Sequence, residues 1–157
     1  MSLRNKIIIV AACALLCLAA GTASGLVTIA EIKTWYVQID KPSWNPPNWL
    51  FAPVWSILYV LMGIALGLVL IQNKGNKRMA ITFFAIQFIL NMAWSFIFFK
   101  MHHLALALAE IVAMWVMILI TIIFFSKMQK TAAWLLVPYI SWVSFASLLT
   151  FAIWKLN

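Results

Sequence analysis

Long apolar runs, separated by short polar segments, make up most of the chain. Each run has about the 20 residues that a helix needs to cross the hydrocarbon core of a bilayer. None shows the regular alternation of polar and apolar residues that marks the strands of a membrane β-barrel, so we predict helices. The expected transmembrane helices span residues 7–30, 51–72, 79–99, 104–126 and 131–154.

The predicted fold class is therefore all-α: an integral membrane bundle of five transmembrane helices, forming a single domain over residues 1–157. Pro138 lies inside the fifth helix, which it is expected to kink because proline lacks a backbone donor. Two pairs of glycines one helical turn apart favour close helix packing, within one chain or between two. These pairs are Gly21 with Gly25 and Gly63 with Gly67.

The connection between the first two helices, residues 31–49, differs in composition from the rest of the chain. Residues 35–55 hold four tryptophans, one tyrosine and four prolines. This segment is too polar and proline-rich for a membrane helix, yet too aromatic for an ordinary solvated loop. We therefore expect a structured aromatic first loop that covers a site formed by the helices beneath it.

The composition agrees with a membrane protein. The chain is 66% hydrophobic and 9% charged, with a mean hydropathy of +1.05, whereas ordinary soluble domains carry about 25% charged residues. In such a protein the net charge of +8 reflects topology, and we expect no nucleic acid partner.

Cations are divided unequally between the two ends of the predicted bundle. The end with the N-terminus and the second and fourth connections carries seven cations and no acid: Arg4, Lys6, Lys74, Lys77, Arg78, Lys127 and Lys130. The opposite end carries Lys33, Lys41, Lys100 and Lys155 with Glu31, Asp40 and Glu110. The positive-inside rule then predicts a cell-membrane protein with a cytoplasmic N-terminus and with the first loop and C-terminus facing outward.

The sequence has no conventional catalytic constellation and no metal-ligand spacing. Cys13 and Cys17, one turn apart on the first helix, are expected to be small buried residues. His102 and His103 are interpreted as polar residues at the membrane interface, with axial haem ligation as the weaker alternative. Glu110 is a candidate functional acid, but it lies near a helix end, which favours snorkelling or pairing with Lys100.

Polar and aromatic side chains share one face of the third helix. A side-chain amide left in hydrocarbon costs several kcal/mol, so this face must point into the bundle. It is either a hydrogen-bonded seam between helices or the wall of a ligand cavity. Its members are Gln87, Asn91, Trp94, Ser95 and Phe98.

Aromatic stripes on the second and fifth helices include Trp55, Tyr59, Trp142 and Phe145. Each stripe alone is most simply explained by packing, but together with the loop they indicate a shared aromatic cavity. Trp49 and Trp154 stand at predicted helix ends and fit the role of interface anchors.

Several Trp- and Pro-rich motifs occur in a distinctive order and spacing. They are Trp35-Tyr36, KPSWNPP (41–47), Val54-Trp55, LYVLMG (58–63), NMAWS (91–95), WLLVPY (134–139), Trp142 and Phe145-Ala146. Together they resemble the signature of the TspO/translocator protein family, also called tryptophan-rich sensory proteins or peripheral benzodiazepine receptors. The resemblance covers nearly the whole chain.

This resemblance implies a five-helix membrane bundle, usually a homodimer, that binds small molecules between its helices under the first loop. The implied ligands are porphyrins (protoporphyrin IX and haem) and isoquinoline- or benzodiazepine-like compounds, bound as ligands and not as required cofactors. The implied roles are sensing, transport or handling of tetrapyrroles, and stress response. The residues expected to contact ligand are Tyr36, Pro46, Trp55, Asn91, Trp94, Ser95, Trp142 and Ala146.

Three functional readings stay open. The first is a receptor or sensor in which Asn91, Lys33 or Lys41 meets the porphyrin propionates. The second is a light-dependent enzyme that oxidatively degrades protoporphyrin IX, with Trp55 and Trp142 as its catalytic candidates. The third is a structural membrane protein whose aromatics only pack and anchor.

The resemblance also implies cholesterol binding in some family members, through a motif near the C-terminus. That motif expects a tyrosine before Lys155, where this chain has Phe151. Phenylalanine keeps the stacking surface but lacks the hydroxyl group, so we do not expect tight cholesterol binding.

Overall fold

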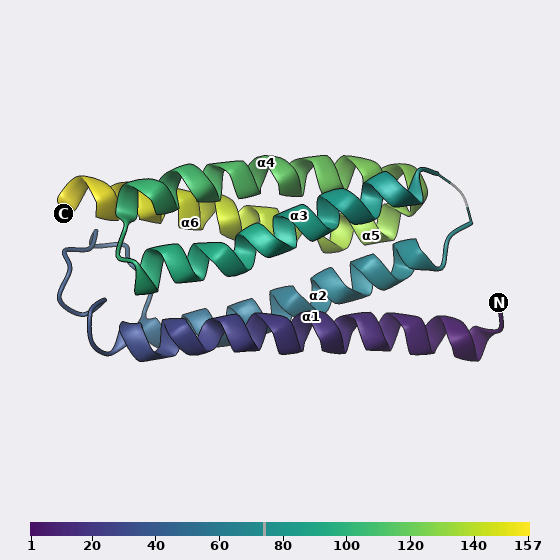
Figure 1. The fold of residues 1–157 in the computed structure, drawn as a ribbon, viewed down its shortest axis with the longest axis horizontal. Coiled ribbons are helices and arrows are strands. Elements are labelled where there is room, and N and C mark those ends of the chain that lie inside the picture. Colours follow the sequence, from purple (N-terminus) through teal and green to yellow (C-terminus); the bar gives the residue numbers. More distant parts are fainter. Residues whose placement is uncertain (74) are drawn as a thin grey trace.

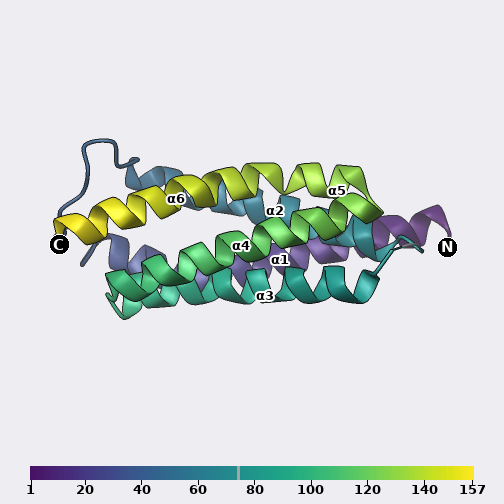
Figure 2. The ribbon, with the colours of Figure 1, turned by 90° about the horizontal axis from the view of Figure 1, so that it is seen from above.

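The computed structural model describes residues 1–73 and 75–157, so Lys74 of the expected basic turn lies outside the described residues. The helices run along one long axis, with the N-terminus at one end and the C-terminus beside the first loop at the other (Figures 1 and 2). They are α1 (Leu3–Ile32), α2 (Phe51–Leu70), α3 (Lys77–Ser95), α4 (Leu104–Met128), α5 (Lys130–Leu135) and α6 (Val137–Leu156).

Within the described residues, five helical segments are long and apolar enough to cross a membrane. The predicted all-α membrane bundle is confirmed, with α5 and α6 together forming the last segment. Side chains just before three of the helices fix where those helices begin, by accepting a first-turn N–H that has no helical partner. These side chains are Ser2 before α1, Asn76 before α3 and His103 before α4.

Pro138 does more than kink the last helix. The regular α-helix is interrupted at Leu136, where the amide donates to Ala133 O at 3.1 Å, three residues back, and Pro138 stands in the first turn of α6. Proline fits there because the first amides of a helix have no intrahelical partner. The expected single helix is therefore two helices joined at one residue.

The end of the third helix nearest the first loop widens into a π-turn over Phe96–Lys100, where Met101 N donates to Phe96 O at 3.0 Å. This wider turn brings two consecutive side chains, Phe98 and Phe99, into the interior. The sequence pattern predicted an ordinary helix here, because π-turns have no simple periodic signal.

Glycines on α2 allow its close packing against α1 in the same chain. A Cβ atom at Gly63 would collide with the backbone of Cys13 and Ala14, and one at Gly67 would lie 2.6 Å from the Cα atom of Val10. The Gly63 and Gly67 pair thus packs within one chain, a choice that the sequence left open.

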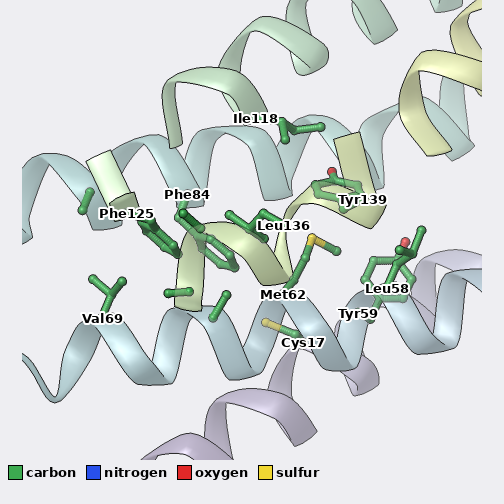
Figure 3. Close-up of a cluster of buried hydrophobic side chains, with 14 of the residues drawn as sticks. Cys17, Leu58, Tyr59, Met62, Val69, Phe84, Ile118, Phe125, Leu136 and Tyr139 are labelled. Atoms are coloured by element: carbon green, nitrogen blue, oxygen red, sulfur yellow. The ribbon is translucent and has the colours of Figure 1, made fainter. Parts of the chain in front are cut away.

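The main core lies in the half of the bundle away from the first loop, around Met62, Ile118, Phe125 and Tyr139 (Figure 3). Cys17 reaches this core from α1, and Cys13 is also buried, as the sequence predicted. A smaller cluster around Tyr36, Phe98 and Phe99 joins the loop to the helix ends. The region between the two clusters holds the cavity described below.

We expect Gly63→Val to destabilise the bundle, because its side chain meets α1 backbone, which cannot rotate away. Overpacking of this kind costs about 1–3 kcal/mol, or about 2–4 °C in Tm per kcal/mol for a chain of this size. Thermal unfolding of the purified protein in detergent measures the effect. Gly25→Ala is the matched control, because among the described residues nothing lies within 4 Å of its added Cβ. Equal Tm values for the two variants would contradict this packing.

Candidate functional site

A cavity of about 320 Å³ lies between the helices directly beneath the first loop. That volume falls at the lower end of the range of small-molecule pockets. Its wall is largely apolar and comes from α1, α2, α6, the end of α3 with its π-turn, and the loop. Prominent lining residues are Gly25, Lys33, Tyr36, Phe51, Trp55, Tyr59, Trp94, Ser95, Phe98, Trp142, Ala146 and Leu149.

The structure brings most of the predicted ligand contacts together around this cavity. The lining includes Tyr36, Trp55, Trp94, Ser95, Trp142 and Ala146. Pro46 and Asn91 lie outside the lining that the described residues form. The Pro46 carbonyl accepts a hydrogen bond from Asn45 Nδ2 at 3.1 Å, so Pro46 shapes the loop from behind the cavity.

Asn91 sits in a hydrogen-bonded network below the cavity. Tyr59 Oη donates to Asn91 Oδ1 at 2.7 Å, and Asn91 Nδ2 donates to Tyr139 Oη at 3.0 Å. Tyr139 Oη in turn donates to Gln87 Oε1 at 2.8 Å. These four side chains are buried and connect α2, α3 and α6. The network therefore fixes the floor of the cavity, where Tyr59 is exposed to its interior.

The polar face of α3 thus has two roles. Part of it is the hydrogen-bonded seam between helices and part of it is a wall of the cavity, the two alternatives that the sequence left open. Gln87 and Asn91 form the hydrogen-bonded seam, whereas Trp94, Ser95 and Phe98 line the cavity nearer the loop. Helical spacing alone placed all five on one face but could not say where along that face the seam ends.

Aromatic rings form most of the wall. The Trp55 ring stacks on Tyr59 with centroids 5.6 Å apart, and Trp94 stacks on Phe98 at 4.9 Å. Phe51 meets Trp142 edge to face at 6.3 Å. Such arrangements favour flat aromatic partners, which can add to existing stacks.

The roof of the cavity is the first loop, held by buried contacts of its own. Tyr36 is 2% exposed and its hydroxyl donates to Asn45 Oδ1 at 2.7 Å. Burial raises the pKa of Tyr36 to about 12, and the hydrogen bond to Asn45 acts in the opposite direction. Tyr36 is therefore a neutral donor at physiological pH and stabilises the loop as much as it lines the cavity.

Lys33 and Lys41, which the sequence analysis considered as partners for the propionates of a porphyrin, differ in their position relative to the cavity. Lys41 Nζ donates to the backbone carbonyls of Tyr36 and Ile39, both at 2.6 Å, so its charge supports the loop. Lys33 lies in the cavity lining. Of these two lysines, only Lys33 borders the cavity.

The loop is also tied to the end of α6. Asp40 N donates to Asn157 Oδ1 at 3.0 Å, and Asn157 Nδ2 donates to Asp40 O at 2.9 Å. Trp44 packs edge to face on Phe145 at 5.8 Å. The roof is therefore fastened at several points along its length.

The structure corrects the expectation for Glu110. Its side chain is buried, and both carboxyl oxygens lack a hydrogen-bond partner among the described residues, so it neither snorkels nor pairs with Lys100. The expectation failed because Glu110 lies on the inner face of α4, and spacing from a helix end says nothing about rotation around the axis.

The histidines lie at the loop end of the bundle. His102 stacks on Trp35 at 4.2 Å with its Nε2 atom 3.4 Å from Glu31 Oε2, and His103 caps α4. In the part of the chain that the structure describes, no three His, Cys, Asp or Glu side chains gather as metal ligands.

The sequence analysis missed the α1 wall of the cavity and its upper rim. Gly21, Thr22, Gly25, Thr28 and Ile29 line the cavity from α1, and Phe51, Phe99 and Thr150 are among the further lining residues. Gly21 and Gly25 indicated close packing of α1 but did not show that this helix lines a cavity. The small and apolar residues of that helix otherwise look alike on every face, so no pattern selected the lining side.

These features define a multi-pass α-helical membrane protein with an internal aromatic cavity roofed by a tightly held loop. Residues 13–155 match the TspO/MBR family, so the chain belongs to that family and the resemblance stated above is confirmed.

Relatives from bacteria, archaea and animals share this similarity. The chain is 44% identical to the tryptophan-rich protein TspO of Chlorobaculum tepidum over 99% of both chains. It is 40% identical to the protein of that name from Archaeoglobus fulgidus, over 89% of this chain and 91% of the relative. It is 32% identical to the translocator protein of Bos taurus, over 83% of this chain and 79% of the relative. The names of these relatives thus refer to tryptophan content in two cases and to translocation in the third.

We expect Asn91→Ala to destabilise the protein, because it removes the partner of two buried tyrosine hydroxyls. Leaving a buried polar group unpaired costs about 1–3 kcal/mol, and thermal unfolding in detergent measures this cost. Ile89→Ala, which truncates an exposed side chain on the same helix, serves as the control. An Asn91→Ala variant as stable as that control would show that the network contributes little.

The loop should lose stability at alkaline pH. The pKa of Tyr36 in the folded protein lies above its ordinary value of 10.0, so its contribution is complete below pH 10 and declines as the pH rises toward about 12. The Tm of the wild type should therefore approach that of Tyr36→Phe over this interval. A constant difference between the two proteins would contradict the assignment.

Proposed function

We propose that this protein binds flat apolar molecules with an acidic edge in the cavity beneath its first loop. Porphyrins, namely protoporphyrin IX and haem, are the principal candidates, and isoquinoline- or benzodiazepine-like compounds are further ligands. Each is a ligand and not a required cofactor. In the cell this binding would serve sensing, transport or handling of tetrapyrroles, and stress response.

The observation that carries this proposal is the convergence of four tryptophans, Trp49, Trp55, Trp94 and Trp142, on one apolar cavity with one lysine in its lining. Trp55, Trp94 and Trp142 come from different helices and meet only through the fold. Aromatic contacts of this kind contribute about 0.5–1.5 kcal/mol each beyond area burial. Lys33 can then form a charge-assisted hydrogen bond to a carboxylate.

The cellular placement follows from charge. We propose the cell membrane, with the N-terminus in the cytoplasm, because four described cations lie at the helix termini of that end: Lys77, Arg78, Lys127 and Lys130. The first loop and C-terminus then face outward. A homodimer within the bilayer is part of the proposal, as expected for this family.

A light-dependent oxidation of protoporphyrin IX is the second candidate function. Trp55 and Trp142, its expected catalytic residues, both line the cavity. The reaction would draw on the excited porphyrin, on dioxygen as the oxidant and on the redox-active indoles. No conventional acid or base is needed for such a step.

Titration with protoporphyrin IX, followed by quenching of tryptophan fluorescence, tests binding. We expect saturable quenching, and we expect Ala146→Phe to weaken binding by at least about tenfold because it fills the cavity. Leu148→Phe, on the exposed face of the same helix, should bind like the wild type. Unsaturable quenching in the wild type would refute the proposed function.

Illumination of the bound complex separates the two candidate functions. A receptor or sensor should give only the slow bleaching seen for porphyrin in protein-free micelles. An enzyme should give a defined product whose formation disappears in Trp55→Phe and Trp142→Phe while binding is retained. Absorbance spectra and chromatography of the products distinguish these results.

A further inference from the structure

The two helices that form one side of the cavity are packed tightly at one level and separate at another. Gly63 and Gly67 bring α2 against the backbone of α1 in the half away from the loop, and the Tyr59 ring fills the space beside Gly21. One turn further toward the loop, a Cβ at Gly25 would meet nothing within 4 Å among the described residues. The cavity begins at that level.

Above this level, the cavity lining reaches the outside of the bundle. Thr22 and Ile29 on α1, and Ala52 and Ser56 on α2, each line the cavity and are also exposed. Side chains with both properties mark an opening in the wall. We call the gap between these four residues the α1–α2 window.

The window lies at the depth of the hydrocarbon core, and its rim is apolar enough to contact acyl chains. Thr22 lies about 15 Å along α1 from its loop end, and α1 as a whole is about 45 Å long, so Thr22 stands within a hydrocarbon core of about 30 Å. Its hydroxyl donates to Leu18 O at 2.7 Å, and that of Ser56 donates to Ala52 O at 2.8 Å. The rim therefore presents no unpaired polar group to the acyl chains.

The loop over the cavity is fastened in place, although the exposed part of the lining continues past the window to Lys33, Asn48 and Trp49 at the loop end. Tyr36 is buried and bonded to Asn45, Lys41 bridges two loop carbonyls, and Asn157 fastens the loop at Asp40. Opening this roof would break several of these contacts together. Passage through the window breaks none of them.

We propose that ligands exchange between the cavity and the bilayer through the α1–α2 window, while the loop stays closed. This inference rests on the proposed function, and it defines the ligand class further as amphiphiles already dissolved in the outer leaflet. Such a molecule holds its acidic group near the headgroups and its flat apolar part among the acyl chains. Lys33, just beyond the end of α1, lies at the headgroup level, so the ligand enters with its charge already beside its partner.

Exchange kinetics test the window. The protein is reconstituted in phosphatidylcholine vesicles, and binding and release of protoporphyrin IX are followed by stopped-flow quenching. Ser56→Phe narrows the rim from α2, and Thr22→Phe narrows it from α1. We expect both variants to slow association and dissociation alike by about tenfold, with Kd nearly unchanged.

Matched variants separate the window from other effects. Ile57→Phe and Leu26→Phe place the same bulk on exposed neighbouring positions outside the lining, and they should exchange ligand at wild-type rates. Asn157→Ala releases the tie between loop and α6. It should also leave both rates unchanged, because the loop does not open.

Wild-type rates in both window variants would overturn the proposal. So would faster exchange in Asn157→Ala, which would assign the route to the loop. If the variants instead bound more weakly through faster dissociation alone, Ser56 and Thr22 would be walls of the site and not its rim, and the proposal would likewise be overturned. Absence of saturable quenching in the wild type would instead refute the proposed function, and the window with it.

Discussion

The bundle depends on the buried chain of hydrogen bonds from Tyr59 through Asn91 and Tyr139 to Gln87. Hydrocarbon offers no partner for a phenol or an amide, so these groups must find one another. Their pairing holds α2, α3 and α6 in one arrangement. Below this level the helices are filled by Met62, Phe125 and their neighbours, and above it they separate around the cavity. The network therefore sets where packing stops and the candidate site begins.

The loop completes the site by a different kind of interaction. Its order comes from polar contacts of its own backbone and side chains, with Lys41 on two carbonyls and Tyr36 on Asn45. Aromatic rings then attach it to the helix ends, as when Trp35 meets Phe98 at 5.6 Å. The π-turn contributes by turning both Phe98 and Phe99 toward the loop. The first loop is therefore a firmly held roof over a cavity that opens at its side, between α1 and α2.

Much of the candidate site was predictable, since the stripes on α2, α3 and α6 pointed to a shared cavity and the family motifs named its residues. Tyr36, Trp55, Trp94, Ser95, Trp142 and Ala146 all line it. The prediction was less complete for Asn91, which lies beneath the cavity, and failed for Glu110, which is buried without a partner in the described chain. Both outcomes depend on the rotation of a helix about its axis and on the positions of the neighbouring helices. The spacing of residues along the sequence determines neither of these quantities.

The sequence by itself determined the membrane-crossing segments, the aromatic loop and the family, because hydrophobic length, proline content and motif order are local properties of the chain. Only the tertiary structure decided that Gly63 and Gly67 pack within one chain, that α1 forms a wall of the cavity, and that the wall opens between α1 and α2. These features arise from the approach of segments far apart in sequence. The physical reason is that a lipid-facing side and a cavity-facing side of an apolar helix have the same composition, so only its neighbours tell them apart.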